Sequence, residues 1–308
     1  MRLTIVGQGL VGTLAAFEAE RRGEDFVVVD QGSGAPATRA AAGLFNPLTG
    51  PRFTADTDRW DRILPYYRGL EQNLGVALVH PLPLRRLWDG AKVGPGAFPQ
   101  SAPGWTAEAR PDGVWIEGGG WVNLEVLLDA ARARWLAAGR LEERLFGPGE
   151  GRGARVLWSG GVADLAGPVW GPVVAGRWQP VRGDVLTVRI PGLTLDHGEM
   201  GSRFLLPLGE GCFRWGATHE SDVDDQGPRP EARRILEGEL AKRLGAALSD
   251  LEFEVIGHRW GVRPSSRSGV PVIEGHPSER GWVLANGFGG RGVALGPRWV
   301  GRIWERLG

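Results

Sequence analysis

The first thirty residues contain the pattern that most restricts what this chain can fold into. An apolar run at residues 3–6 leads into Gly-x-Gly-x-x-Gly at residues 7–12, and apolar residues then recur at helical spacing up to residue 22. A second apolar run at residues 26–29 ends at Asp30. This order predicts a strand, a tight turn, a helix and a second strand, which together open a nucleotide-binding α/β domain.

Each glycine of this pattern has a physical role. Gly7 makes the turn, Gly9 lets the backbone approach a pyrophosphate, and Gly12 lets the helix pack against the strand, while N–H groups at the helix start face the anion. Asp30 stands where a carboxylate binds a ribose hydroxyl. The pattern therefore predicts a dinucleotide site. Because 50 of the 308 residues are glycine, a purely structural strand-helix-strand start is the alternative.

Composition excludes several classes of partner. The chain has 36 basic and 36 acidic residues and a formal net charge of zero, so it lacks the positive charge with which proteins bind nucleic acids or anionic membranes. No window approaches about eighteen uninterrupted apolar residues, and the first strand begins too early to leave room for a signal peptide. We therefore expect a cytoplasmic protein that binds neither nucleic acid nor membrane.

Cysteine and histidine are sparse. Cys212 is the only cysteine, which rules out an intrachain disulfide and a multi-cysteine metal site. The five histidines are scattered without the paired spacing of metal ligands. The sequence predicts no metal centre, and we interpret Cys212 as a small buried residue.

A run of small residues follows the second strand. Residues 38–44 read Thr-Arg-Ala-Ala-Ala-Gly-Leu, and an Asn-Pro break follows at residues 46–47. Backbone with such short side chains can lie flat against a planar ligand. A plain alanine-rich helical turn is the alternative interpretation.

Three segments together resemble the flavoprotein family of D-amino acid oxidase, glycine oxidase and sarcosine oxidase. They are the glycine pattern with Asp30, residues 38–44, and the glycine-rich residues 286–297, and the resemblance covers nearly the whole chain in the right order. It implies an α/β chain (α+β overall), with a Rossmann-like FAD-binding lobe and a second, mostly antiparallel-sheet substrate lobe. The implied FAD-binding domain is residues 1–50, 119–178 and 257–308, and the implied substrate domain is residues 51–118 and 179–256.

The resemblance also implies how FAD is held. Relatives with covalent flavin attach it in the C-terminal loop, whereas Cys212 lies in an expected hairpin, so we expect noncovalent FAD. Between residues 139 and 155 the chain is shorter than in relatives, and we assign no adenine-contacting residue there. The implied cofactor-binding residues are Gly7, Gly9, Leu10, Val11, Gly12, Asp30, Gln31, Thr38, Arg39, Ala41, Ala42, Gly43, Leu44, Ser159, Gly160, Gly287, Gly289, Gly290, Gly292 and Val293.

The activity that the resemblance implies is oxidation of a C–N bond in a small amine or amino acid, by hydride transfer to flavin N5. Dioxygen or another acceptor would then reoxidise the flavin. Arg263, in Trp-Gly-Val-Arg-Pro, matches the family's arginine that binds the substrate carboxylate through two parallel hydrogen bonds. Because arginine is the default cation of this chain, a structural ion pair is the alternative. Arg291 is the second catalytic candidate, and it contacts either the substrate or the flavin.

The chain departs from the family's pattern over the substrate. Its only tyrosines are Tyr66 and Tyr67, so the phenols that relatives place there from the hairpin are absent, and we expect Phe204, Trp215 or His219 in such places. This departure leaves a flavin-binding protein without turnover as an alternative. The glycine pattern by itself also permits an NAD-dependent dehydrogenase, but that class does not explain why the C-terminal segment returns to the site.

Hydrophobic spacing predicts further elements outside the site. The expected helices are residues 57–74, 124–138 and 230–245, with a terminal helix after Pro297 that runs to Leu307. The expected strands are residues 76–79, 155–158 and 282–286, with a hairpin that joins residues 204–208 to 212–216.

Overall fold

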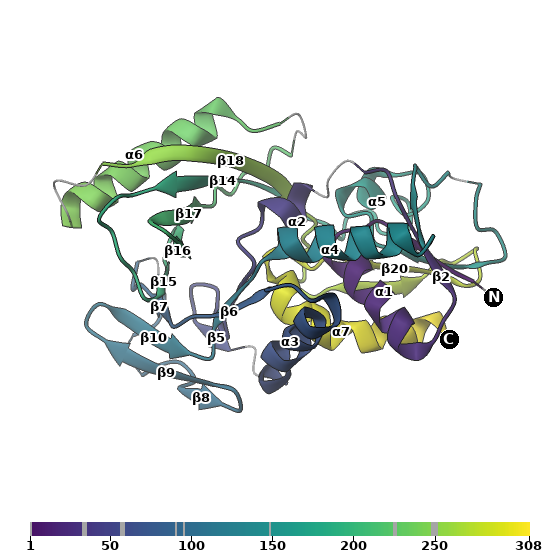
Figure 1. Cartoon of the computed structure of the whole chain (residues 1–308), viewed down its shortest axis with the longest axis horizontal. Coiled ribbons are helices and arrows are strands. Elements are labelled where there is room, and N and C mark those ends of the chain that lie inside the picture. Colours follow the sequence, from purple (N-terminus) through teal and green to yellow (C-terminus); the bar gives the residue numbers. More distant parts are fainter. Residues whose placement is uncertain are drawn as a thin grey trace.

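The chain folds into two halves, each built on its own sheet (Figure 1). The computed structural model describes residues 2–32, 36–55, 59–89, 91–94, 96–147, 149–223, 227–247 and 252–308. A parallel sheet flanked by helices forms the half where both termini lie, and a large curved sheet forms the other half. The predicted fold class, a Rossmann-like sheet with a second, largely antiparallel sheet, is confirmed.

The parallel sheet contains the predicted strand-helix-strand unit. Its order is β12 (Leu141–Glu143), β2 (Phe26–Asp30), β1 (Leu3–Val6), β13 (Arg155–Trp158), β20 (Trp282–Asn286) and β19 (Val272–Gly275). β19 runs antiparallel to β20, and the other neighbours are parallel. All of β2 except Asp30 is buried, because helices cover both faces of such a sheet. The predicted strands 155–158 and 282–286 are confirmed.

Several helices accompany this sheet. They are α1 (Leu10–Arg22), α3 (Ile63–Leu74), α4 (Leu124–Ala137), α5 (Val162–Ala166), α7 (Gly292–Leu307) and the short 3-10 helices η1 (Trp60–Arg62) and η2 (Gly289–Arg291). α1 ends as predicted, at Arg22, and the next residue, Gly23, adopts the left-handed conformation (φ 70°) that favours glycine after a helix C-terminus. α4 confirms the predicted helix at 124–138. The predicted helix at 57–74 is η1 followed by α3, and residues 56–58 lie outside the described residues.

The terminal helix begins earlier than predicted, at Gly292, so Pro297 lies inside it. Proline has no N–H group, so the carbonyl of Val293, four residues earlier, lacks its helical donor. The hydroxyl of the fully buried Tyr67 donates to this carbonyl at 2.9 Å. A side chain from α3 therefore satisfies the backbone group that the proline leaves open, and the helix continues through it.

The second sheet has nine strands and is mostly antiparallel. Its order is β18 (Glu254–Arg263), β14 (Val181–Arg189), β17 (Cys212–Gly216), β16 (Phe204–Gly209), β15 (Gly198–Met200), β7 (Leu84–Arg86), β10 (Gly113–Glu117), β9 (Trp105–Arg110) and β8 (Ser101–Ala102). β15 and β7 pair in parallel. The predicted hairpin is confirmed as β16 and β17. Helix α6 (Pro230–Ala247) covers the outer face and packs its leucines, including Leu236 and Leu240, against β14 and β17.

Short elements connect the halves. They are α2 (Pro36–Ala40), β3 (Leu44–Phe45), β4 (Leu48–Thr49), β5 (Thr54–Ala55), β6 (Val79–Pro81) and β11 (Gly120–Val122). The predicted strand at 76–79 is largely wrong, because β6 begins only at Val79. The backbone N–H groups of Leu78 and Val79 both donate to the carboxylate of Glu71 at 2.7 Å. The Glu71 side chain on α3 thus accepts the two backbone hydrogen bonds that a neighbouring strand would otherwise accept.

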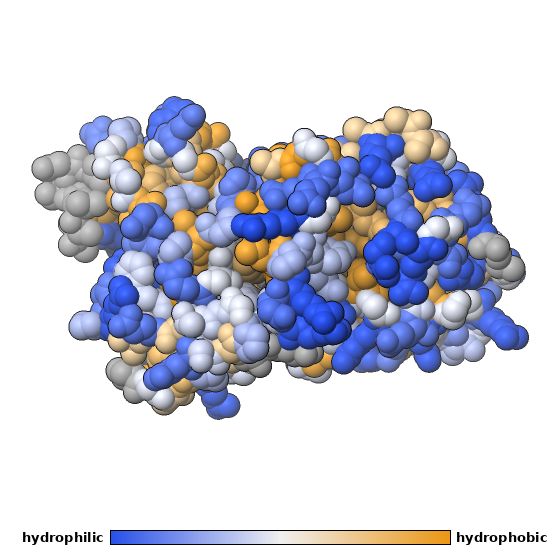
Figure 2. Space-filling view, turned by 60° about the horizontal axis from the view of Figure 1, so that its bottom comes forward, coloured by the Kyte–Doolittle hydropathy of each residue, from blue (hydrophilic) through white to orange (hydrophobic). Residues whose placement is uncertain are grey.

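Polar residues cover much of the face shown in Figure 2, and apolar residues form small patches among them. Within the described residues, no helix combines the length and the apolar character needed to span a bilayer.

Candidate cofactor and substrate site

A cavity of about 1220 Å³ is lined by residues of both halves. The carboxyl ends of β1, β2, β13 and β20 open into it, which is where ligands bind in open parallel sheets. Both catalytic candidates, Arg263 and Arg291, line it. So do the following predicted cofactor-binding residues: Gly7, Gly9, Leu10, Val11, Asp30, Gln31, Thr38, Ala41, Ala42, Gly43, Leu44, Ser159, Gly160, Gly289, Gly290, Gly292 and Val293. Gly12, Arg39 and Gly287 are not part of this lining.

The turn between β1 and α1 presents a helix N-terminus to the cavity. Gly7 has φ 94°, and a Cβ added to Gly12 would lie 2.0 Å from the Gly7 carbonyl oxygen, so both positions require glycine. Gly9 caps α1 without a side-chain hydrogen bond, and the first turn contains no acidic residue. The N–H groups there are aligned with the positive end of the helix dipole, which suits a phosphate.

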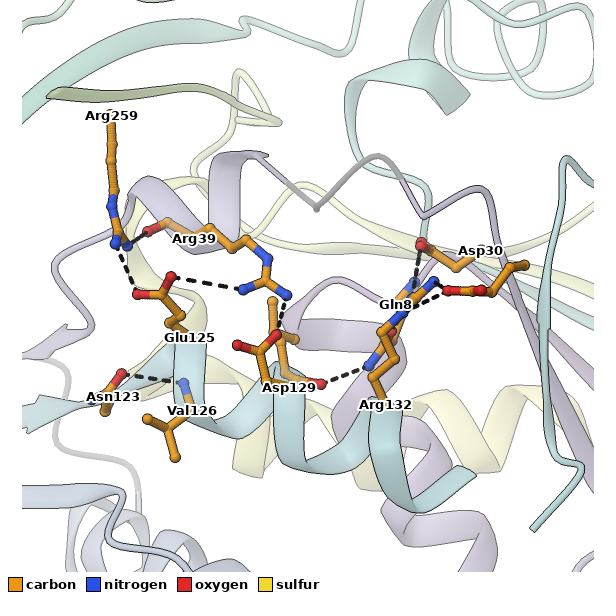
Figure 3. A network of polar contacts seen from close by, with 11 residues as sticks. Gln8, Asp30, Arg39, Asn123, Glu125, Val126, Asp129, Arg132 and Arg259 are labelled. Carbon is orange, nitrogen blue, oxygen red and sulfur yellow. Dashed lines mark hydrogen bonds and ion pairs between the residues drawn. The ribbon is translucent and has the colours of Figure 1, made fainter. Parts of the chain in front are cut away.

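Asp30 is held at the cavity wall by several donors (Figure 3). Its carboxylate accepts hydrogen bonds from the backbone N–H of Gln8 at 2.8 Å and of Gly32 at 3.0 Å. Arg132 of α4 contacts it at 3.3 Å and also binds the Gln8 side chain at 2.5 Å. Arg132 was not predicted from the sequence, because nothing in the pattern of α4 distinguishes it from the other arginines.

Helix α2 is tied both to α1 and to α4. The Thr38 hydroxyl accepts a hydrogen bond from Leu10 N at 3.2 Å, which places Thr38 beside the α1 N-terminus. Arg39 instead reaches α4, where its guanidinium pairs with Asp129 (Figure 3). Arg259 binds the Arg39 carbonyl at 3.1 Å and Glu125 at 2.9 Å. The structure thus places the Arg39 side chain away from the cavity, and its predicted cofactor contact stays a prediction.

The C-terminal glycine segment brings a second helix N-terminus to the same cavity. Asn286, at the end of β20, accepts a hydrogen bond from Gly287 N and donates to the Gly161 carbonyl, both at 2.8 Å. The N-terminus of α7 has no side-chain cap and no acidic residue in its first turn. The Arg291 side chain donates to the Gly269 carbonyl. Two helix N-termini whose N-cap residues make no side-chain hydrogen bond therefore open into one cavity.

Asp164 on α5 is a cavity residue that the sequence analysis missed. It is buried, and its carboxylate accepts hydrogen bonds from Gly160 N at 2.8 Å and from Asn286 at 3.2 Å. Burial raises the pKa of Asp164 to about 7, although both hydrogen bonds oppose that shift. Arg144, Leu145 and Phe146 also line the cavity, in the stretch where we assigned no adenine contact.

Arg263 is a partly buried cation that lies against backbone. Its guanidinium faces the carbonyls of Arg182 at 3.5 Å and Thr218 at 3.4 Å, and a Cβ added to Gly183 would lie 2.3 Å from Nη2. Burial lowers the pKa of Arg263, and the charge of Asp184 opposes this. Among the described residues no ion pair joins Arg263 to a carboxylate.

Nearby carboxylates are already engaged by other groups. Asp184 binds His258 at 2.9 Å and Arg182 at 3.2 Å. Arg203, another cation of the cavity wall, pairs with Glu239 at 2.6 Å. Arg263 is therefore available to an anion that enters the cavity.

The residues expected in place of the missing phenols divide into two groups. Phe204 and His219 line the cavity. Trp215 does not, because it is buried on the other side of β17 and donates its indole N–H to the Leu236 carbonyl of α6 at 2.8 Å. Tyr67 is fully buried beneath α7, so its phenol does not reach the cavity.

The arrangement suits a flavin dinucleotide better than a metal. No group of three or more potential metal ligands occurs among the described residues. The N-terminus of α1 with Asp30 suits a pyrophosphate and a ribose, and the N-terminus of α7 suits the negative charge of a reduced flavin ring. Together with the parallel sheet and the antiparallel sheet of the other half, these features are typical of dinucleotide-dependent oxidoreductases.

Comparison with known proteins defines the family. A family model described as FAD dependent oxidoreductase (DAO) matches residues 2–303, and the chain belongs to this family. Glycine oxidase of Pseudomonas aeruginosa is 26% identical over 96% of this chain and 92% of its own. The crystal structure of glycine oxidase from Geobacillus kaustophilus superposes with TM-score 0.74 at 19% identity, covering 99% of this chain and 94% of that one. Iminodiacetate oxidase from Chelativorans sp. BNC1 gives TM-score 0.71 at 19% identity, covering 99% and 95%.

Proposed function

We propose that this FAD-dependent enzyme oxidises the C–N bond of a small amino acid. The observation that carries the proposal is Arg263, a guanidinium in the cavity wall that has no carboxylate partner among the described residues. A buried cation is costly unless an anion compensates it, and a planar guanidinium binds a carboxylate through two parallel hydrogen bonds. The similarity to glycine oxidase and iminodiacetate oxidase supports the same substrate class.

The residues of this chain bind and orient the reactants. Bound FAD supplies the acceptor of a hydride from the substrate Cα. The first turn of α1 and Asp30 would hold the pyrophosphate and the ribose, and the first turn of α7 would stabilise negative charge on the ring. Arg263 would fix the carboxylate and so direct Cα–H toward the ring. Phe204 and the backbone of residues 41–44 would exclude water from the reacting atoms.

The proposal also covers how FAD is bound, what reoxidises it and how the chain divides into domains. FAD is bound noncovalently, because Cys212 lies in the hairpin and is not part of the cavity lining. Dioxygen or another acceptor reoxidises the flavin. The FAD-binding domain comprises residues 1–50, 119–178 and 257–308, and the substrate domain comprises the two intervening segments.

Anaerobic mixing of the purified protein with candidate substrates tests this function. We expect the protein to release FAD on denaturation, and we expect at least one compound among glycine, sarcosine, proline and the D-amino acids to bleach the flavin absorbance. Simple amines without a carboxylate should act poorly. Release of FMN or of a nicotinamide dinucleotide would contradict the cofactor assignment.

A flavin-binding protein without turnover is the second candidate. The observation that favours it is the absence of a phenol at the site, since Tyr67 is buried under α7 and Tyr66 does not line the cavity. This candidate predicts that every member of the panel leaves the flavin oxidised. The same experiment therefore separates the two functions.

A further inference from the structure

His219 lies beside the proposed carboxylate anchor. It follows Thr218, whose carbonyl oxygen accepts a hydrogen bond from Nη1 of Arg263 at 3.4 Å, and both His219 and Arg263 line the cavity. A substrate whose carboxylate binds Arg263 would therefore place its remaining atoms close to the imidazole.

The hydrogen bonding of His219 determines its tautomer. Nδ1 lies 3.2 Å from the Ala217 carbonyl oxygen, and a carbonyl only accepts, so Nδ1 carries the proton. In a neutral imidazole the other nitrogen, Nε2, is then an unprotonated acceptor.

The surroundings favour this neutral form. Partial burial lowers the pKa of His219, and the positive charges of Arg263 on β18 and Arg203 before β16 lower it further, although the hydrogen bond to the Ala217 carbonyl opposes this shift. The nearby carboxylates pair elsewhere: Glu239 with Arg203, Glu220 with Arg229, and Asp184 with Arg182 and His258. None of these pairs supplies a counter-charge that would hold a proton on His219.

In the antiparallel half, His219 is the one titratable group of the described cavity wall that can accept a proton near neutral pH. Within the described residues, the titratable side chains of the lining are two carboxylates, five guanidiniums and one imidazole. Asp30 and Asp164 belong to the parallel-sheet half. A guanidinium does not accept protons near neutral pH. His219 is the remaining group.

We propose that Nε2 of His219 accepts a proton from the substrate's ammonium group, which makes His219 a further catalytic residue. An amino acid near neutral pH carries an ammonium whose nitrogen has no lone pair to form C=N. Transfer of one N–H proton to Nε2 gives imidazolium and a neutral amine. The amine lone pair then forms the C=N bond as Cα loses its hydrogen with two electrons to FAD.

After each turnover, His219 must lose the proton that it has accepted. His219 is partly exposed to solvent, so the imidazolium can pass its proton to water before the next turnover. The proposal rests on the proposed amino acid oxidation.

The test compares His219→Gln with wild type and with His80→Gln. His80 is also a histidine of lowered pKa, but it stacks on Trp121 outside the cavity lining. The measurement is the anaerobic rate of flavin reduction by the fastest amino acid of the panel, between about pH 6 and about pH 10. Released FAD and the perturbation of flavin absorbance by acetate, a carboxylate without an amine, serve as independent readouts.

We expect His219→Gln to bind FAD and acetate normally and to reduce its flavin on the order of 10²-fold more slowly near neutral pH. The deficit should shrink as the pH approaches the ammonium pKa of the free substrate, because the amine then arrives deprotonated. His80→Gln should match wild type at each pH. A deficit that is constant with pH, or no deficit, overturns the proposal. If no amino acid reduces wild-type flavin, the proposed function itself has failed.

Discussion

Replacing Gly183 by alanine should damage substrate binding without touching the cofactor. The new Cβ would lie 2.3 Å from Nη2, 2.6 Å from Nη1 and 2.7 Å from Cζ of Arg263. Gly183 lies within β14 and has no positive φ, so the backbone itself accepts a side chain. The strain therefore falls on the guanidinium, which must move by about 1 Å to reach an ordinary contact distance.

A displacement of this size has a large kinetic effect. Misplacing a reacting group by about 1 Å costs on the order of 10²-fold in rate, or about 2.7 kcal/mol of transition-state stabilisation. We expect this loss in kcat/KM for amino acids in anaerobic flavin reduction, with FAD content unchanged. Gly257→Ala is the matched control, because Gly257 lies in the adjacent strand β18 and its added Cβ would meet only Thr187, at 3.3 Å. Unchanged kinetics in Gly183→Ala would refute the assignment of Arg263.

Three further predictions concern other parts of the site and the core. Asp30→Ala should weaken FAD binding by about 1.5–3 kcal/mol, the value of a charge-assisted hydrogen bond, and unchanged affinity in a fluorescence titration would contradict the ribose contact. Because burial raises the pKa of Asp164 from 3.8 to about 7, the folded state holds a proton that the unfolded state has lost, so this group's contribution to stability is present below about pH 4 and lost as pH rises to about 7. Urea unfolding at equal FAD saturation should show this loss in wild type and not in Asp164→Asn, and identical pH dependence in both would contradict it. Tyr67→Phe should lower the free energy of unfolding by about 1–3 kcal/mol, because it leaves the buried Val293 carbonyl without a donor, and equal urea midpoints would show that the bond is not needed.

Much of the fold could be predicted from local patterns in the sequence. The glycine pattern at residues 7–12, the apolar strand at 155–158 and the hairpin at 204–216 depend on residues close together in the chain, and each has the predicted structure. The strand predicted at 76–79 and the start of the terminal helix were misjudged. Both errors arise from side chains on α3, Glu71 and Tyr67, which bind backbone groups elsewhere.

Site residues whose roles depend on contacts far away in the sequence could not be predicted either. Arg263 was predicted to bind the substrate because Trp-Gly-Val-Arg-Pro resembles a motif of the family, and the structure adds that no carboxylate pairs with it among the described residues. Asp164 and Arg132 have no local signal, because their roles depend on Asn286 and Asp30, far away in sequence. The Arg39 side chain lies toward α4 because Asp129 is within reach, which its own segment does not reveal.

The most direct test of Arg263 as the carboxylate-binding residue is the rate of anaerobic flavin reduction in wild type, Arg263→Lys and Arg259→Lys, measured with amino acids and with simple amines. Arg259 lies on the same strand and pairs with Glu125 outside the cavity lining, so it controls for loss of an arginine from β18. Lysine lacks the planar fork that binds a carboxylate at two points. We expect Arg263→Lys to keep its FAD and to lose efficiency only toward amino acids, whereas Arg259→Lys should behave as wild type. Equal losses for amino acids and simple amines in Arg263→Lys, or loss of FAD, would contradict the claim that Arg263 binds the substrate carboxylate.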